Sequence, residues 1–400
     1  MGIRSMASKQ PKASPQVSVR EVEQYVQDHL QRYLKELGDL CAIDSGTYNK
    51  AGVDMVALTL QKRMRGLGME VSLHEQEKWG NDLYGILHGN GQGKVTVLGH
   101  IDTVYPVGTA ATRPVQVQGN KVLGPGVYDM KGCILSAIYA LEALLAQDYH
   151  DFGEIHFLCV TDEEISERHS KGLIWQACRD SQGVLVLEGA RENGDLVSAR
   201  KGGSWYKLSA HGHCAHAGVE PEKGRNAIVE LAHQILQFQS LNGWREGVTI
   251  NVGRISGGTV PNVVPDYAEV SLDLRFLRNV DRYDTERRWY EMMQNHCVPG
   301  VELKLVCDLG GKDPMECTPQ SLHLVHAAQD IAQQLGFEVN HAATGGISDA
   351  NYACGFGLPT LDGLGPIGDL DHSPDEYIEL DSIAPRAALV AGLIASIGGA

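Results

Sequence analysis

Histidines and carboxylates stand where this chain is expected to leave strands and loops. His100 and Asp102 follow the apolar run 95–98, and they share one face because strand side chains alternate. Asp129 follows the sequence Gly-Pro-Gly at 124–126, where backbone freedom lets a carboxylate approach a site closely. A histidine and carboxylates at strand ends are the components of a metal site.

Further donors follow along the chain. Asp162, Glu163 and Glu164 form a run of acids after an expected strand, and their mutual repulsion disfavours burial unless a cation compensates. Glu188 ends an apolar run, and His372 follows a Gly/Pro-rich loop. Nitrogen and oxygen donors without cysteine suit zinc or another divalent ion, and a shared carboxylate would let two ions bind together.

Each segment also fits a plainer interpretation. A lone His-x-Asp is commonly a polar strand end, and Asp129 could cap the helix that follows it. The acids at 162–164 could form a solvated charge run, and His372 could be an ordinary surface histidine. Only their combination points to a metal.

The elements that must position these residues alternate between strand and helix. Apolar patterns predict helices at 18–37, 53–67, 133–146 and 170–179, and strands at 69–73, 83–87, 95–98, 155–160 and 184–187. This rhythm predicts an α/β fold with a mainly parallel sheet and helices on both faces. Ligands gather at the carboxyl ends of strands in such sheets, where the candidate residues fall.

The pattern changes near residue 200. Longer alternating strands are expected at 204–210, 248–255 and 267–276, with helices at 225–238 and 284–296. The βα pattern then resumes with a helix at 322–335, a strand at 359–361 and a helix at 384–397. We therefore predict a disordered tail at 1–17, a catalytic domain from 18–198 and 315–400, and an inserted α+β domain at 199–314.

Composition narrows the class of protein. A chain of 400 residues exceeds what one hydrophobic core usually serves, and a net charge of −16 argues against nucleic-acid or membrane partners. Nine scattered cysteines without a CxxC pair favour a reducing compartment. The polar N-terminus has no apolar segment typical of a secretory signal, and we found no apolar run near the ~18 residues of a membrane span. A cytoplasmic protein is expected.

The order and spacing of short motifs from about residue 95 to 380 resemble the two-metal aminoacylase, carboxypeptidase and desuccinylase family of metallopeptidases, and most of all its glutamate carboxypeptidase branch. The motifs are GHIDTVYP, GPGVYDMKG, TDEE, LEGA, HAGVEP, PNVVP, DLRF, TGGISDANY and DHSPDEY.

The resemblance implies two divalent metal ions, zinc first, with cobalt or manganese as alternatives. Asp129 would bridge them, His100 and Glu188 would complete one ion's ligands, and Glu164 and His372 would complete the other's. Glutamate at position 188 fits the carboxypeptidase and desuccinylase branches better than the dipeptidase branch.

Three more roles follow from the same resemblance. Asp102 would orient His100, and Glu163 would be the general base. The inserted domain would be a lid and dimerisation domain whose His216 reaches a neighbouring subunit's active site, which implies a homodimer.

The resemblance also assigns a set of substrate contacts, which are Asn262, Arg275, Gly345, Gly346 and Ser348. The guanidinium fork of arginine can bind both oxygens of a carboxylate, although Arg275 could also be a plain surface residue. The glycines and the serine would form a backbone pocket beside that carboxylate.

The implied function is metal-dependent hydrolysis of an amide bond next to a carboxylate in a small molecule or short peptide. A carboxypeptidase that releases a C-terminal amino acid such as glutamate is the first hypothesis. An N-acyl amino acid deacylase or desuccinylase is the alternative, and a non-catalytic binding protein is the rival from another class.

Overall fold

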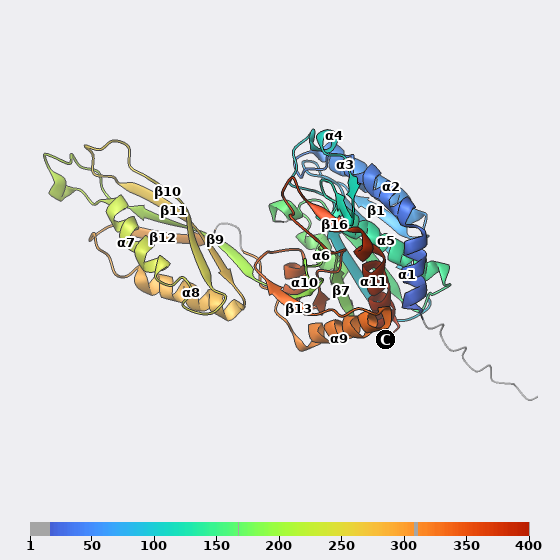
Figure 1. Cartoon of the computed structure of the whole chain (residues 1–400). Helices are drawn as coiled ribbons and strands as arrows, with labels where there is room; N and C mark the ends of the chain where they lie inside the picture. Colours follow the sequence, from blue (N-terminus) through green and yellow to red (C-terminus); the bar gives the residue numbers. More distant parts are fainter. Residues whose placement is uncertain (1–16, 167, 308–310, 400) are drawn as a thin grey trace, which may run out of the picture.

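The computed structural model describes residues 17–166, 168–307 and 311–399 and divides them into a catalytic domain and an inserted domain (Figure 1). The expected disordered tail lies outside the described residues except for Val17. Ser18 caps the first helix as predicted, because its hydroxyl accepts a hydrogen bond from the backbone N–H of Glu21 at 3.3 Å.

A six-stranded sheet in the order β1-β2-β6-β3-β7-β14 forms the centre of the catalytic domain. Its strands are β1 (Glu70–His74), β2 (Asp82–His88), β3 (Lys94–His100), β6 (Glu154–Val160), β7 (Gly183–Val186) and β14 (Thr360–Leu361). The four strands β6, β3, β7 and β14 are mutually parallel, whereas β2 is antiparallel to both β1 and β6. The short β1–β2 connection leaves no room for a helical crossover, which explains the antiparallel pair.

Helices cover both faces of this sheet, as expected for the α/β class. The helices are α1 (Val19–Asp28), α2 (Leu30–Cys41), α3 (Lys50–Arg65), α5 (Lys131–Ala146), α6 (Lys171–Cys178), α9 (Pro319–Leu335), α10 (Ala350–Gly355) and α11 (Ile383–Gly398). Alternate side chains of β3 pack into two cores: Val95 and Val97 join the core that contains α1, α5 and α11, and Leu98 joins the core that contains α6 and α10.

Several short elements were not predicted. A small sheet in the order β15-β16-β5-β4 consists of β4 (Gln116–Gln118), β5 (Lys121–Leu123), β15 (Gly368–Asp369) and β16 (Tyr377–Glu379). A parallel pair joins β8 (Leu196–Arg200) to β13 (His341–Thr344), and a four-residue helix α4 (Thr109–Thr112) precedes β4. Segments this short show no measurable apolar period. The helix expected at 18–37 is two helices, which meet at His29.

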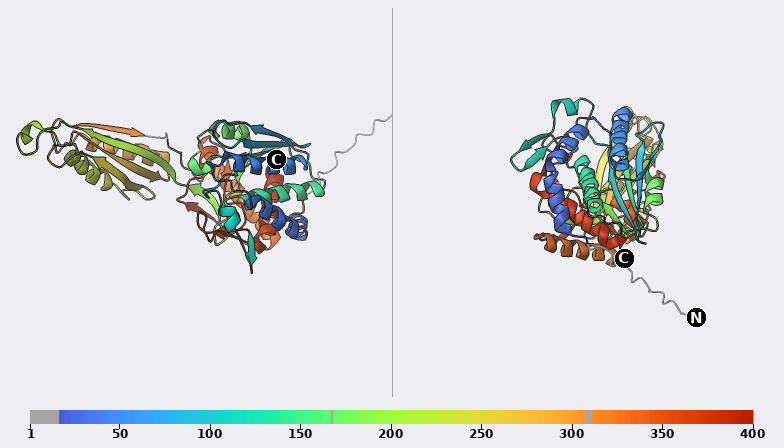
Figure 2. Two further views of the ribbon diagram at one scale, coloured as in Figure 1. Left: turned by 90° about the horizontal axis from the view of Figure 1, so that it is seen from above. Right: turned by 90° about the vertical axis from the view of Figure 1, so that its right-hand side faces the viewer.

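The inserted domain has its own antiparallel sheet in the order β10-β11-β9-β12 and its own hydrophobic core. Its strands are β9 (Gly202–His211), β10 (Thr249–Gly257), β11 (Tyr267–Phe276) and β12 (Glu302–Cys307), and its helices are α7 (Ala227–Gln239) and α8 (Asn279–Met292). The edge strand β12 was not predicted. The domain extends away from the catalytic domain in two perpendicular views (Figures 1 and 2).

The C-terminal stretch Leu380–Gly398, which contains α11, is long and apolar enough to cross a membrane by length and composition. The expectation that no apolar run approaches this length was therefore wrong. In the fold, 72% of the stretch is buried, and α11 packs against α1, α5 and α9, so its apolar surface serves the core.

Candidate active site

The ends of three neighbouring parallel strands bring the predicted ligands together. His100 is the last residue of β3, the short 3-10 helix Glu163–Ile165 follows β6, and Glu188 lies two residues after β7. Because these strands run in the same direction side by side, their carboxyl ends meet at one edge of the sheet. Asp129 reaches the same edge from the loop before α5.

Asp129 stands at the centre of the cluster. Its Oδ1 lies 2.9 Å from Nε2 of His100, and its Oδ2 lies 3.1 Å from Nε2 of His372. The same nitrogen of His372 lies 3.3 Å from Oε2 of Glu164, and Nε2 of His100 lies 3.9 Å from Oε1 of Glu188. All five predicted ligands are therefore close together, and each of the two carboxylate oxygens of Asp129 faces a different histidine.

The donor set fits divalent cations. Among the residues that the structure describes, Oε1 of Glu164 has no hydrogen-bond partner although it is buried, which is costly for an acidic oxygen. Burial raises the pKa of Glu164 to about 8 and the pKa of Glu188 well above its usual value, so clustering these carboxylates without a cation disfavours their charged forms. Two divalent ions would relieve both costs.

The backbone at His372 is unusual. His372 has a φ of 60° and Leu370 a φ of 62°, in the left-handed region that residues other than glycine seldom adopt. Such strain persists only where the surroundings enforce it, and it is common at ligand-binding sites.

Asp102 contacts His100 through both its backbone carbonyl and its carboxylate. Nδ1 of His100 lies 3.0 Å from the carbonyl oxygen of Asp102 and 3.4 Å from its Oδ1. The other carboxylate oxygen accepts hydrogen bonds from the Thr47 hydroxyl at 2.7 Å and from the backbone N–H of Glu164 at 3.3 Å. Asp102 thus links the first predicted ligand to the loop that carries Glu163 and Glu164.

A polar cavity of about 500 Å³ opens beside the cluster. Arg275, Gly345 and Gly346, three of the predicted substrate contacts, line it together with Glu163. The guanidinium of Arg275 binds Asp273 through Nε at 2.7 Å and Nη2 at 2.9 Å, and its Nη1 carries two further N–H donors.

Ser348 does not line this cavity. It is buried, and its hydroxyl donates to Oδ2 of Asp362 at 2.9 Å. Asp362 also accepts a hydrogen bond of 2.6 Å from Nε of Arg200, a cavity residue whose Nη1 donates to the carbonyl of Gly346. Ser348 therefore supports the glycine turn indirectly, through Asp362 and Arg200.

His216 and Asn262 lie away from the cavity. Both are exposed in the inserted domain, and the backbone N–H of Ala217 donates to the carbonyl of Asn262 at 3.0 Å. Gly203 of β9 pairs with Arg275 beside the cavity, and β9 then runs outward to His211. The nine residues from Gly203 to His211 span roughly 26 Å, so His216 lies far from the cluster of its own chain.

Sequence reasoning missed two cations of the cavity wall, Arg200 and Lys312. Nζ of Lys312 lies 4.0 Å from Oε1 of Glu163, and Lys312 is buried. Neither residue stands in a motif pattern, and both are recognisable only after the chain folds.

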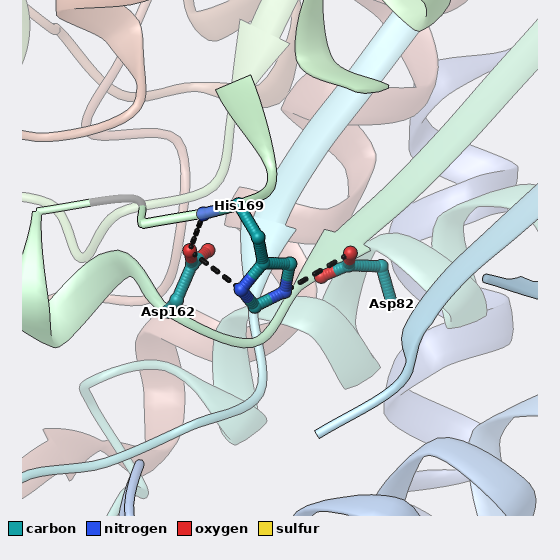
Figure 3. Close-up of side chains that lie close together, drawn as sticks. All are labelled: Asp82, Asp162 and His169. Atoms are coloured by element: carbon teal, nitrogen blue, oxygen red, sulfur yellow. Dashed lines mark hydrogen bonds and ion pairs between the residues drawn. The ribbon is translucent and has the colours of Figure 1, made fainter. Parts of the chain in front are cut away.

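The loop that carries Glu163 and Glu164 is fastened by a second cluster, Asp82, Asp162 and His169 (Figure 3). The His169 ring lies between the two aspartates, with Nε2 at 3.2 Å from Oδ2 of Asp82 and Nδ1 at 2.9 Å from Oδ2 of Asp162. The backbone N–H of His169 also donates to Asp162 at 2.7 Å. We call this group the His169 clamp, because it ties the end of the loop to its start and to β2.

The His169→Gln variant is expected to lose about 1–3 kcal/mol of unfolding free energy at pH 6, because it removes charged hydrogen bonds. Partial burial alone would lower the pKa of His169, but hydrogen bonds to Asp162 and Asp82 outweigh it and raise that pKa to about 9. A raised folded pKa stabilises the fold fully below about 6.5, and this contribution is lost as the pH rises through about 9.

Urea unfolding of wild type and variant from pH 6 to 10 tests this expectation. The difference between them should shrink as the pH rises, and an exposed-histidine control, His323→Gln, should follow wild type throughout. A difference that is constant with pH would show that His169 acts without its charge.

Glu376 is a further residue that sequence reasoning missed, although it stands in the quoted motif DHSPDEY. Its Oε1 accepts hydrogen bonds from the backbone N–H groups of Tyr128 at 2.8 Å and Asp129 at 3.0 Å. Its Oε2 accepts from the N–H of Gly126 at 2.9 Å and from the Tyr105 hydroxyl at 2.7 Å. This buried carboxylate fixes the loop that presents Asp129.

The Glu376→Gln variant is expected to bind metal about 10- to 100-fold more weakly, the usual effect of removing a group that orients a ligand. Its amide NH₂ would face backbone donors that the carboxylate now satisfies. Competition with a chromogenic chelator measures the affinity, and thermal unfolding monitors the fold. Glu379→Gln, whose side chain lies further along β16, is the control, and equal affinities in all three proteins would contradict the positioning role of Glu376.

An α/β catalytic domain with histidine and carboxylate donors at strand ends defines a metal-dependent hydrolase class, and comparison with known proteins identifies the family. Residues 96–396 match the model of peptidase family M20/M25/M40, so the chain belongs to this family.

Similar proteins include carboxypeptidase G2 of Pseudomonas sp. (strain RS-16), 28% identical over 370 residues that cover 91% of this chain and 89% of that protein. Succinyl-diaminopimelate desuccinylase of Stenotrophomonas maltophilia (strain R551-3) is 26% identical over 77% of this chain and 84% of its own length. The crystal structure of aminopeptidase PepT from Bacillus cereus ATCC 10987 shares the fold, with a TM-score of 0.76 at 23% identity over 92% of this chain and 98% of that one.

Proposed function

We propose that this M20-family hydrolase cleaves an amide bond next to a free carboxylate, as a carboxypeptidase that releases a C-terminal amino acid such as glutamate. The observation that carries the proposal is that two features lie side by side, a cluster of candidate metal ligands and a cavity with a carboxylate-binding character. Four side chains with nitrogen or oxygen ligand atoms surround Asp129, and the adjoining cavity presents Arg275 and the Gly345-Gly346 turn. The first feature suits metal-dependent hydrolysis, and the second suits a carboxylate.

His100, Asp129, Glu164, Glu188 and His372 would hold two divalent ions, with zinc proposed first. When bound, such ions lower the pKa of a water molecule and polarise the scissile carbonyl. Glu163 would accept the water proton and return it to the leaving amine. Nη1 of Arg275 and the glycine turn would orient the carboxylate, which aligns the amide with the reacting groups.

We further propose that the working form is a homodimer. The proposal is supported by the positions of His216 and Asn262, which are exposed and remote from their own cluster, so that a second copy of the chain would supply them to an active site. There the His216 side chain would stabilise the developing oxyanion.

The proposed boundaries of this inserted domain are residues 199 and 314. All nine cysteines are free thiols, which supports the proposed cytoplasmic location.

A deacylase or desuccinylase remains the second candidate, because relatives of similar identity carry the name succinyl-diaminopimelate desuccinylase. Both reactions cleave an amide beside a carboxylate. A hydrolysis screen with added zinc, cobalt or manganese separates them, using C-terminal glutamate conjugates against N-succinyl and N-acetyl amino acids. Preference for the glutamate conjugates supports the carboxypeptidase, and preference for other N-acyl amino acids replaces it with the deacylase.

A further inference from the structure

A second cavity, of about 620 Å³, adjoins the polar cavity at Glu164, a residue that lines both. Its other walls come from two loops, one that precedes α3 and one that follows His100 and Asp102. We call it the apolar cleft, and its large side chains are Tyr48, Val104, Tyr105, Pro106, Val107 and Ile165.

The apolar cleft exposes side chains that usually avoid water. Tyr48 is 80% exposed, Val107 is 71% exposed and Val104 is 41% exposed. The ring of Tyr48 also lies 5.6 Å from the ring of Trp79, which extends the apolar surface. Exposed apolar side chains gathered beside a polar site are typical of a ligand-binding groove.

The walls of the cleft are held in place by backbone contacts. The N–H of Thr103 donates to the carbonyl of Ser45 at 2.9 Å, and the N–H of Thr47 donates to the carbonyl of Thr103 at 3.1 Å. The Asp44 carboxylate accepts from the N–H of Gly108 at 2.7 Å. A cleft that is already formed costs little ordering when a ligand binds.

The position of the cleft relates it to the reaction. The Thr47 hydroxyl, on one wall, donates to Asp102, which in turn contacts His100. Arg275 lines the polar cavity and not the apolar cleft, whereas Glu164 lines both. An amide held at the cluster would therefore have a carboxylate-binding cavity on one side and an apolar cleft on the other.

We propose that the apolar cleft binds the acyl side of the substrate, so that the substrates are N-acyl or N-peptidyl amino acids with a large aliphatic or aromatic acyl group. The inference rests on the proposed function and deepens it. The released amino acid occupies the polar cavity, and its acyl partner contacts Tyr48 and Val107.

A substrate series tests the cleft in the full-length, metal-loaded protein. The probes share one amino acid, glutamate, and carry acetyl, butanoyl, hexanoyl, octanoyl or benzoyl groups. We expect kcat/KM to rise about two- to fourfold per added methylene group until the cleft is filled. Val107→Ser should lower kcat/KM for the octanoyl probe about fivefold and for the acetyl probe by a clearly smaller factor, since the longer chain buries more apolar surface in the cleft.

Val280→Ser is the matched control, because Val280 is a comparably exposed valine on α8 of the inserted domain. Tyr48→Ser provides an independent second variant. Light scattering records the oligomeric state of each protein. If the cleft were instead a contact surface between two copies of the chain, both variants would dissociate into monomers. That result would overturn the proposal.

The possible outcomes distinguish a failure of the cleft proposal from a failure of the proposed function. Equal kcat/KM for all acyl groups would overturn the proposal that the cleft binds the acyl group. Equal losses of kcat/KM for all probes in Val107→Ser would overturn it too, and either result would leave the proposed amide hydrolysis intact. Failure to hydrolyse any probe or any peptide conjugate overturns the proposed function, and the cleft proposal falls with it.

Discussion

The Glu163→Gln variant is expected to turn over substrate about 10³-fold more slowly than wild type while it retains its metal, within the range of about 10²–10⁴ that general base catalysis contributes. Glutamine keeps the shape of the side chain but cannot accept and return a proton. Glu163 lines the cavity beside the predicted ligands, and it is not needed to complete the ligand set around Asp129.

The measurement combines kcat with metal content on one preparation. Glu338→Gln, an exposed glutamate between α9 and β13, should behave as wild type in both. Near-normal turnover in Glu163→Gln would show that the base is wrongly assigned, and loss of metal would instead make Glu163 a ligand.

The Asp129→Asn variant is expected to lose at least one of the two ions and at least about 10³-fold in kcat/KM. Asp129 directs one oxygen toward His100 and the other toward His372, at 2.9 and 3.1 Å. Asparagine retains only one oxygen donor, and its NH₂ group cannot bind a cation. A bridging position needs both oxygens, so the smallest change in shape should produce a large loss.

Metal content after exhaustive dialysis tests this expectation, with Asp330→Asn on the exposed face of α9 as the matched control. Retention of two ions per chain in Asp129→Asn would remove Asp129 from the bridging position. Thermal unfolding of the variant separates loss of the ligand from loss of the fold.

The location of the cluster could be predicted because it depends on strand order and periodicity. Parallel strands separated by helices place their carboxyl ends at one edge, so His100 and Glu188 were expected to meet although 88 positions separate them in the chain. The pairing of ligands with individual ions was implied only by resemblance and stays a prediction.

The supporting groups could not be predicted for a physical reason. Glu376 binds backbone N–H groups of a loop almost 250 residues away, and a backbone group leaves no trace in the side-chain pattern. His169 and Asp82 likewise meet only through the pairing of β2 with β6. Fold periodicity predicts where elements lie, whereas these contacts depend on the conformation of loops.

The edge strand β12 illustrates a different limit. Its side chains alternate between exposed and half-buried positions, and none is fully buried, because the strand lies at the edge of the sheet. Pairing with β9 across residues 302–307 defines the strand, and that partner lies about 100 residues earlier.

Metal analysis of the purified full-length protein, combined with hydrolysis of a glutamate conjugate by the same sample, tests the central claim most directly. We predict two divalent ions per chain, loss of activity when a chelator removes them, and recovery when zinc is returned. A protein that holds no divalent ion and hydrolyses the conjugate equally well in the presence of chelator would contradict the account.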